Sequence, residues 1–183
     1  MVELMTVDQL LWVLARVAGL GSYAALAVAL VTGIALRTAV LDWLGSNRAL
    51  RSLHEFTTVL WIPLAVLHLV ALVLDKTSRI ALIDLVVPFR SSYGTLAIGL
   101  GTLAVDLLLV VTVTAYLKRR MPGGLWKWLH RLSYVAFALT FLHAVLSGTD
   151  FSDPVVSAIT WSAGAMLLVL ALTRVVWGRL PAR

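Results

Sequence analysis

Long apolar runs separated by short polar connections make up almost the whole chain. Several of these runs exceed the ~18 apolar residues typical of a membrane-spanning helix, and clusters of glycine, proline and serine interrupt them as turn signals. The pattern therefore predicts five transmembrane helices. We expect them at roughly Leu10–Leu36, Ala49–Leu74, Gly94–Leu117, Leu125–Leu146 and Val155–Val176.

The composition agrees with this pattern. Of 183 residues, 61% are hydrophobic and 13% are charged, whereas a soluble domain is nearer half apolar and a quarter charged. We expect an all-α integral membrane protein that forms a single domain over residues 1–183, with no soluble domain beside the helices. The sequence contains no cysteine, which excludes disulfides, thiolate metal sites and covalent cofactor attachment through Cys-x-x-Cys-His.

Basic residues indicate the orientation of the helices. Eleven of the fifteen lysines and arginines lie on alternate connections, at their flanks or at the C-terminal end. By the positive-inside rule, this predicts an outside N-terminus and a cytoplasmic C-terminus, in a multi-pass protein of the cell membrane (inner or plasma membrane). The formal net charge of +6 then reflects topology and contact with anionic headgroups. We expect no nucleic-acid partner, because that would need a basic face on a soluble surface.

The four histidines of the chain all fall in the predicted second and fourth spans. Ionisable residues inside a membrane are costly and are usually functional. Both spans run from inside to outside, so His54 and His130 lie at an inner level, and His68 and His143 lie at an outer level. Spacings of 14 and 13 residues separate these levels by roughly 20 Å at the rise of an α-helix.

Two histidines at each level favour haem over zinc. A structural zinc ion needs about four protein ligands and a catalytic one usually three, and neither level has an obvious third. A haem iron needs only two axial ligands, and histidine suits that role. Helical phase supports the second span, where the two imidazoles are within roughly 40° of one face, but leaves those of the fourth span about 140° apart. A tilted crossing or a π-bulge must absorb that difference.

The spacing of the histidines and their neighbours resembles the ferric reductase-like transmembrane domain family, which includes NADPH oxidases and ferric-chelate reductases. The similar segments are Leu53-His54, Leu67-His68, Asp106-Leu107-Leu108, Trp128-Leu129-His130-Arg131-Leu132-Ser133-Tyr134 and Gly148-Thr149-Asp150. The resemblance implies a small stand-alone bacterial member in which His54, His68, His130 and His143 are the axial ligands of the iron in two stacked b haems, held between the second and fourth helices. In the family, such haems carry electrons between the membrane faces.

The resemblance also leaves open where electrons come from and go. Longer members continue into a flavin and NADPH module, whereas this sequence has no Gly-x-Gly-x-x-Gly turn opening a βαβ unit. We therefore expect a separate donor, either a flavoprotein reductase or a membrane quinol. An outer acceptor would be ferric chelate, oxygen or a partner protein.

Four further residues are candidate contacts of the haems. Trp61 lies midway between the two histidines of its span, about 20° off their face, where it lies either between the haems or in the apolar core. Phe137 lies midway along the fourth span. Arg51 and Arg131 lie at the inner level, where haem propionates need charge partners, although positive-inside topology also explains them.

Two charged residues inside the spans and one connection have alternative interpretations. Asp106 is either a hydrogen-bond partner or proton relay near a quinol or the outer haem, or a residue paired with Thr102, Thr112 or a helix neighbour. Arg16 either reaches the lipid headgroups or binds an outer-haem propionate. The apolar segment Ile80–Phe89 is too short to span a membrane, which predicts an interfacial or re-entrant piece that covers the outer haem.

The main hypothesis is a dihaem b-type cytochrome that acts as an oxidoreductase between the two faces of the membrane. The alternative is a haem-binding electron-conduit subunit with no substrate of its own, which completes a larger complex. In neither case does the sequence indicate a catalytic side chain apart from the haem ligands. A haem-free structural or transport protein is a third possibility.

Overall fold

Five long α-helices form the structure, a computed structural model that describes residues 5–38, 43, 45–148 and 153–177. Each helix agrees with its predicted span to within three residues at either end, and all five are long and apolar enough to cross a membrane. The prediction of an all-helical, multi-pass membrane protein is confirmed. The helices are α1 (Val7–Ala35), α2 (Asn47–Leu74), α3 (Thr95–Tyr116), α4 (Gly123–Ser147) and α5 (Pro154–Trp177), with two 3₁₀ turns, η2 (Leu82–Leu85) and η3 (Lys118–Arg120).

Polar side chains cap three of the helices where they begin. Thr6 accepts a hydrogen bond from the amide of Gln9 at 3.2 Å, and the Gln9 side chain accepts one from the Thr6 amide at 2.8 Å, which forms a capping box. Ser46 accepts from the amide of Ala49 at 3.3 Å at the start of α2. Asp153 does the same for the first turn of α5. These caps satisfy amides that have no partner within their own helix.

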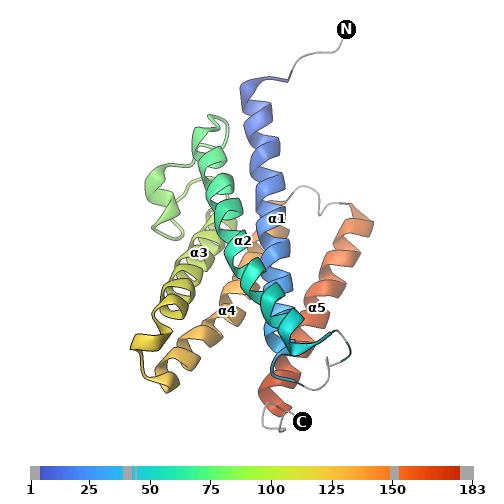
Figure 1. Ribbon diagram of the computed structural model, residues 1–183. Helices are drawn as coiled ribbons and strands as arrows, with labels where there is room; N and C mark the ends of the chain where they lie inside the picture. The colour runs from blue at the N-terminus through green and yellow to red at the C-terminus, as the bar shows by residue number, and fades with distance from the viewer. Residues whose placement is uncertain (1–4, 39–42, 44, 149–152, 178–183) are drawn as a thin grey trace.

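Consecutive helices run antiparallel, so the bundle consists of two helical hairpins and a fifth helix (Figure 1). In the hairpins, α1 packs along α2, and α3 packs along α4. The helices α2 and α4 point the same way, opposite to α1, α3 and α5. The last turns of α1, α3 and α5 therefore lie at the same end of the bundle as the first turns of α2 and α4. This arrangement brings the predicted basic connections to one end of the bundle. Which end faces the cytoplasm stays a prediction.

The middle of the bundle is closed by one buried residue from each of the first four helices. Ala25, Trp61, Leu108 and Ala136 form this cluster. The buried face of α1 consists mostly of small residues: Ala15, Ala18, Ser22, Ala25, Ala29 and Thr32. Small side chains allow close approach of helix backbones, which is the usual basis of helix packing in membranes.

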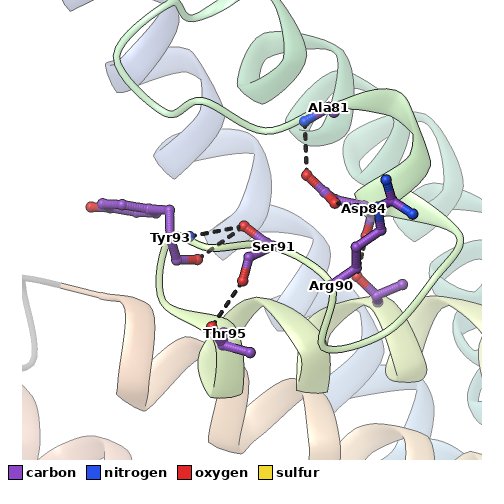
Figure 2. Close-up of polar contacts among 7 residues, drawn as sticks. Ala81, Asp84, Arg90, Ser91, Tyr93 and Thr95 are labelled. Atoms are coloured by element: carbon purple, nitrogen blue, oxygen red, sulfur yellow. Dashed lines mark hydrogen bonds and ion pairs between the residues drawn. The ribbon is translucent and has the colours of Figure 1, made fainter.

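The connection between α2 and α3 is held firmly on α3 (Figure 2). The carboxylate of Asp84 accepts a hydrogen bond from the amide of Ala81 at 3.0 Å and lies 3.8 Å from Nε of Arg90. The hydroxyl of Thr102, on α3, donates to the carbonyl of Asp84 at 2.8 Å. Thr95, in the first turn of α3, donates in turn to the carbonyl of Ser91 at 2.8 Å. The segment predicted to be interfacial or re-entrant is therefore anchored at its polar positions.

Candidate functional site

The structure brings the four histidines together as two pairs between α2 and α4. The ring centroids of His54 and His130 lie 6.4 Å apart, and those of His68 and His143 also lie 6.4 Å apart. The two rings of each pair are nearly perpendicular, with interplanar angles of 80° and 76°. We refer to them as the 54/130 pair and the 68/143 pair.

The helix that carries His130 and His143 reaches both pairs without a local irregularity. Every residue of α4 from Gly123 to Ser147 is α-helical, so the π-bulge considered for this span is absent. Of the two explanations considered, the tilt of α4 against the other helices (Figure 1) is left. It accounts for how two histidines on different faces of α4 both reach α2. A tilted helix approaches its partner with different faces at different heights.

Three of the four histidines donate a hydrogen bond from Nδ1 to a backbone carbonyl of the other helix in their hairpin. His68 bonds to the carbonyl of Ala15 at 2.7 Å, His54 to that of Ala29 at 2.9 Å, and His143 to that of Ala97 at 2.8 Å. A carbonyl oxygen only accepts, so Nδ1 carries the proton in each ring. The lone pair of each ring is therefore on Nε2, the atom available to a metal.

A glycine beside each of these contacts gives the imidazole room to reach the carbonyl. A Cβ atom on Gly19 would lie 2.8 Å from Nδ1 of His68, and one on Gly101 would lie 2.6 Å from Nδ1 of His143. A Cβ on Gly33 would lie 3.3 Å from Cε1 of His54. Each glycine is four residues after the accepting alanine, so it lies on the same face of the helix one turn further on.

His130 differs from the other three histidines. Within the described part of the chain, two buried side-chain nitrogens have no hydrogen-bond partner, namely Nδ1 of His130 and Nε1 of Trp126. The two rings stack on one another, with centroids 5.2 Å apart and an interplanar angle of 18°. The position of His130 thus depends on stacking against its own helix rather than on a backbone acceptor.

The separation of the paired rings fits a single metal ion held between them. Metal–nitrogen bonds to histidine are about 2.0–2.1 Å long, and the nitrogen lies about 1.1 Å from its ring centroid, so two opposed imidazoles on one ion have centroids roughly 6.2–6.4 Å apart. Both pairs match this value. Among the described residues, no group of three or more histidine, cysteine, aspartate or glutamate side chains could hold a metal ion. Each pair therefore suits a group that needs two axial protein ligands, as haem iron does.

Trp61 and Phe137, the aromatic residues predicted midway along their spans, are both buried. Trp61 belongs to the central cluster between the two histidine pairs, and its carbonyl accepts a hydrogen bond from Ser22 of α1 at 3.3 Å. Phe137 stacks on Tyr23 of α1, with centroids 5.4 Å apart and an interplanar angle of 19°. The contribution of Tyr23 was not expected from the sequence.

The charged residues named as candidates differ in their exposure and contacts. Arg51 and Arg131 are exposed, on α2 and α4 near the 54/130 pair. The guanidinium of Arg16 lies 4.2 Å from the ring centroid of Trp12, as in a cation–π contact. Asp106 is only partly exposed on α3. Thr102, one of the partners considered for it, donates instead to the carbonyls of Asp84 and Ile98.

One segment of the resemblance is only partly described. Gly148 ends α4 as its C-cap, whereas Thr149 and Asp150 lie outside the described residues. The basic residues Arg179 and Arg183 of the C-terminal end also lie outside them.

A family model described as a domain of unknown function, DUF8596, matches residues 10–150. The chain belongs to this family. The matched region contains all but the first three residues of α1, the whole of α2, α3 and α4, and all four histidines, so both pairs are part of the DUF8596 domain. No solved structure matches the chain.

A curated relative has a name that states a cofactor. Over 85 residues, the DUF8596 chain is 34% identical to the protein-methionine-sulfoxide reductase heme-binding subunit MsrQ of Herminiimonas arsenicoxydans. The match covers 45% of this chain and 36% of the relative. The chain thus spans little more than a third of the length of the relative it matches.

Proposed function

We propose that this protein is a dihaem b-type membrane cytochrome of the ferric reductase-like class, with one haem at the 54/130 pair and one at the 68/143 pair. The observation that carries the proposal is the 6.4 Å separation of the ring centroids in both pairs, which fits two axial imidazoles on one iron. The similarity to a heme-binding subunit supports it. Because the sequence has no cysteine, the haems would be held without covalent bonds, as in b-type cytochromes.

The side chains of this site orient the ligands and exclude water. Hydrogen bonds to the carbonyls of Ala15, Ala29 and Ala97 fix three imidazoles with Nε2 unprotonated. Trp61 closes the apolar core between the two pairs. Bound haem would supply one-electron chemistry at two levels of the membrane. The exposed arginines Arg51 and Arg131 are suited to pair with propionates at the 54/130 level.

The direction of electron flow and the partners are part of the same proposal. We expect electrons to enter at the 54/130 pair, on the cytoplasmic side, from a flavoprotein reductase or a membrane quinol. They would leave at the 68/143 pair to ferric chelate, oxygen or a partner protein outside. The basic connections that meet at the 54/130 end of the bundle support this orientation.

The second candidate is an electron-conduit subunit that delivers electrons only to a partner protein. The observation that favours it is the name of the relative, which is a subunit of a reductase. In this case the outer connection anchored by Asp84 and Thr102 would meet the partner rather than a small acceptor.

Visible spectroscopy tests the haem assignment. We expect the purified protein to show a b-type α-band on reduction with dithionite, and about two haems per chain by pyridine haemochromogen assay. His68→Ala and His130→Ala should each remove one haem. The chain has no histidine outside the two pairs and no cysteine, so nothing replaces the lost ligand. A wild-type protein that binds no haem, or variants that both keep two, would overturn the assignment.

Vesicles that hold the reduced protein distinguish the two candidates. Ferric chelate or oxygen is added outside, and reoxidation is followed at the α-band. Fast reoxidation without a partner supports the self-sufficient reductase. Reoxidation that occurs only after a partner protein is added supports the conduit subunit.

A further inference from the structure

The residue one helical turn before each histidine distinguishes His130 from the other three. Four residues before each of His54, His68 and His143 the sequence has a leucine. Four residues before His130 it has Trp126. Residues four apart lie on the same face of a helix, and helical side chains lean toward the N-terminal end. The residue at this position is therefore the one that each imidazole leans toward within its own helix.

The hydrogen bonds of the four rings divide in the same way. The three histidines that follow a leucine donate from Nδ1 to a backbone carbonyl of the neighbouring helix, at 2.7 to 2.9 Å. Nδ1 of His130 is buried and has no hydrogen-bond partner among the described residues. The tryptophan thus occurs at the histidine whose ring is not fixed by a backbone acceptor.

Trp126 contacts His130 through a stack of nearly parallel rings. Their centroids are 5.2 Å apart and their planes differ by 18°. The torsion that sets the plane of an imidazole has broad minima of its own, so neighbouring atoms must restrain it. An imidazole that turned away from this plane would meet the face of the indole ring in a closely packed interior. The stack therefore restrains the plane of His130, as the carbonyls restrain those of the other three histidines.

The aromatic face of Trp126, rather than its polar group, makes this contact. Nε1 of the indole is also buried and has no hydrogen-bond partner in the described part of the chain. Trp128 provides a comparison on the same helix, since it is 60% exposed. Two residues along an α-helix correspond to about 200°, so Trp128 lies on the other side of α4 from Trp126.

We propose that Trp126 is a positioning residue, which sets the plane of the haem ligand His130 by stacking, in place of a backbone acceptor. This inference rests on the proposed function, because it concerns a haem ligand. It makes the two haems inequivalent. At the 68/143 pair, hydrogen bonds to neighbouring helices fix both ligand planes, whereas at the 54/130 pair one of the two planes is fixed by a side chain of the same helix.

The stack also has an electronic consequence for the haem at the 54/130 pair. The face of an indole ring is negative and attracts positive charge. An imidazole bound to ferric iron carries more positive charge than one bound to ferrous iron. Trp126 therefore stabilises the ferric state of this haem, and loss of its aromatic face should raise the reduction potential.

Three substitutions on α4 test the inference, each in a His68→Ala background that retains only the 54/130 pair. Trp126→Leu introduces the residue type that precedes the other three histidines, and so removes the aromatic face. Trp126→Phe keeps an aromatic face without the N–H group. Trp128→Leu is the matched control, because its side chain is exposed.

The measurements are electron paramagnetic resonance of the ferric haem and the midpoint potential, from equilibrium titration of the α-band. We expect Trp126→Leu to change the highest g value, because the plane of His130 is no longer restrained. It should also shift the ferric-to-ferrous ratio by about threefold, which raises the potential by ~28 mV. Trp126→Phe should keep both values close to those of the His68→Ala protein, and Trp128→Leu should change neither.

The outcomes separate this inference from the proposed function. Changes in Trp126→Leu that Trp126→Phe prevents support it. Haem that binds in all three variants with unchanged g values and potential overturns the inference and leaves the proposed function intact. Equal changes in Trp126→Leu and Trp126→Phe also overturn it, since they would assign the effect to the N–H group. Absence of haem in the wild-type protein overturns the proposed function itself.

A further arm covers a Trp126→Leu protein that yields no haem in this background. The substitution is then made with His68 intact, so that the haem of the 68/143 pair reports on folding. Loss of only the haem at the 54/130 pair supports the inference, because a folded chain has lost one positioned ligand. Loss of both haems overturns it, since a positioning residue of one pair does not control the other.

Discussion

Gly101→Ala is the substitution for which the structure allows the most detailed prediction. The new methyl group would lie 2.6 Å from Nδ1, 2.8 Å from Cε1 and 3.0 Å from Cγ of His143. Ordinary van der Waals contact begins at 3.4 Å, so the imidazole must retreat by about 0.8 Å to accommodate it. Since three ring atoms are too close, a rotation of the ring in place does not relieve the overlap.

This displacement affects both the hydrogen bond of the His143 imidazole and its distance from His68. The hydrogen bond to the carbonyl of Ala97, now 2.8 Å, would lengthen to about 3.6 Å, a distance at which it no longer counts as a hydrogen bond. The ring would also approach His68 by up to about 0.8 Å, which takes the centroid separation below the roughly 6.2 Å that one metal ion requires. Loss of such a supporting hydrogen bond alone typically costs ~10–100-fold in metal affinity.

We therefore expect Gly101→Ala to lose the haem of the 68/143 pair and to keep that of the 54/130 pair. The measurement is haem per chain in protein purified from membranes, by pyridine haemochromogen assay. Gly21→Ala is the matched control, because its Cβ would make only ordinary contact with Leu64, at 3.4 Å. It should keep both haems, and the helix should tolerate it, since alanine is favoured over glycine within a helix by up to ~1 kcal/mol. A Gly101→Ala protein with two haems and an unchanged spectrum would refute the reasoning.

Three further predictions concern the ligand planes, the outer connection and the orientation. The interplanar angles of 80° and 76° predict strongly anisotropic low-spin ferric signals in electron paramagnetic resonance, and ordinary rhombic low-spin spectra, as given by parallel ligand planes, would contradict them. In Gly99→Ala the new methyl group overlaps the ring of Phe89, which should release the α2–α3 connection and speed tryptic cleavage after Arg90, whereas cleavage at the wild-type rate would show that Phe89 does not anchor it. Because the chain lacks cysteine, single-cysteine variants report orientation: a membrane-impermeant thiol reagent should label Ser92→Cys in intact cells and Arg120→Cys only after permeabilisation, and the reverse pattern would invert the topology.

The five helices were predictable because apolar length is a strong signal in a membrane protein. The grouping of the four histidines into two levels follows from their spacing and from antiparallel topology, and the structure places the rings accordingly. The fourth span was harder to predict. A straight helix separates its histidines by about 140°, and the tilt that reconciles them depends on packing against neighbouring helices rather than on any residue within α4.

The hydrogen-bond acceptors of the histidines could not be predicted from side chains, because the acceptors are backbone carbonyls. A signal nevertheless existed: the 14-residue spacing from Gly19 to Gly33 equals that from His54 to His68. The stack of Tyr23 on Phe137 carried no such signal. It depends on how α1 and α4 approach each other, which no local pattern determines.

The carbonyls that hold the histidines have a consequence for how the protein is assembled. Within α1, the carbonyl of Ala15 is already the acceptor for the amide of Gly19 in the regular helical pattern, and a carbonyl oxygen has a second lone pair for His68. Before any cofactor arrives, every such backbone group is thus satisfied within its own helix, as the hydrocarbon interior demands. We therefore expect the helices to insert into the membrane without haem. Haem would then bind in a separate step, after insertion.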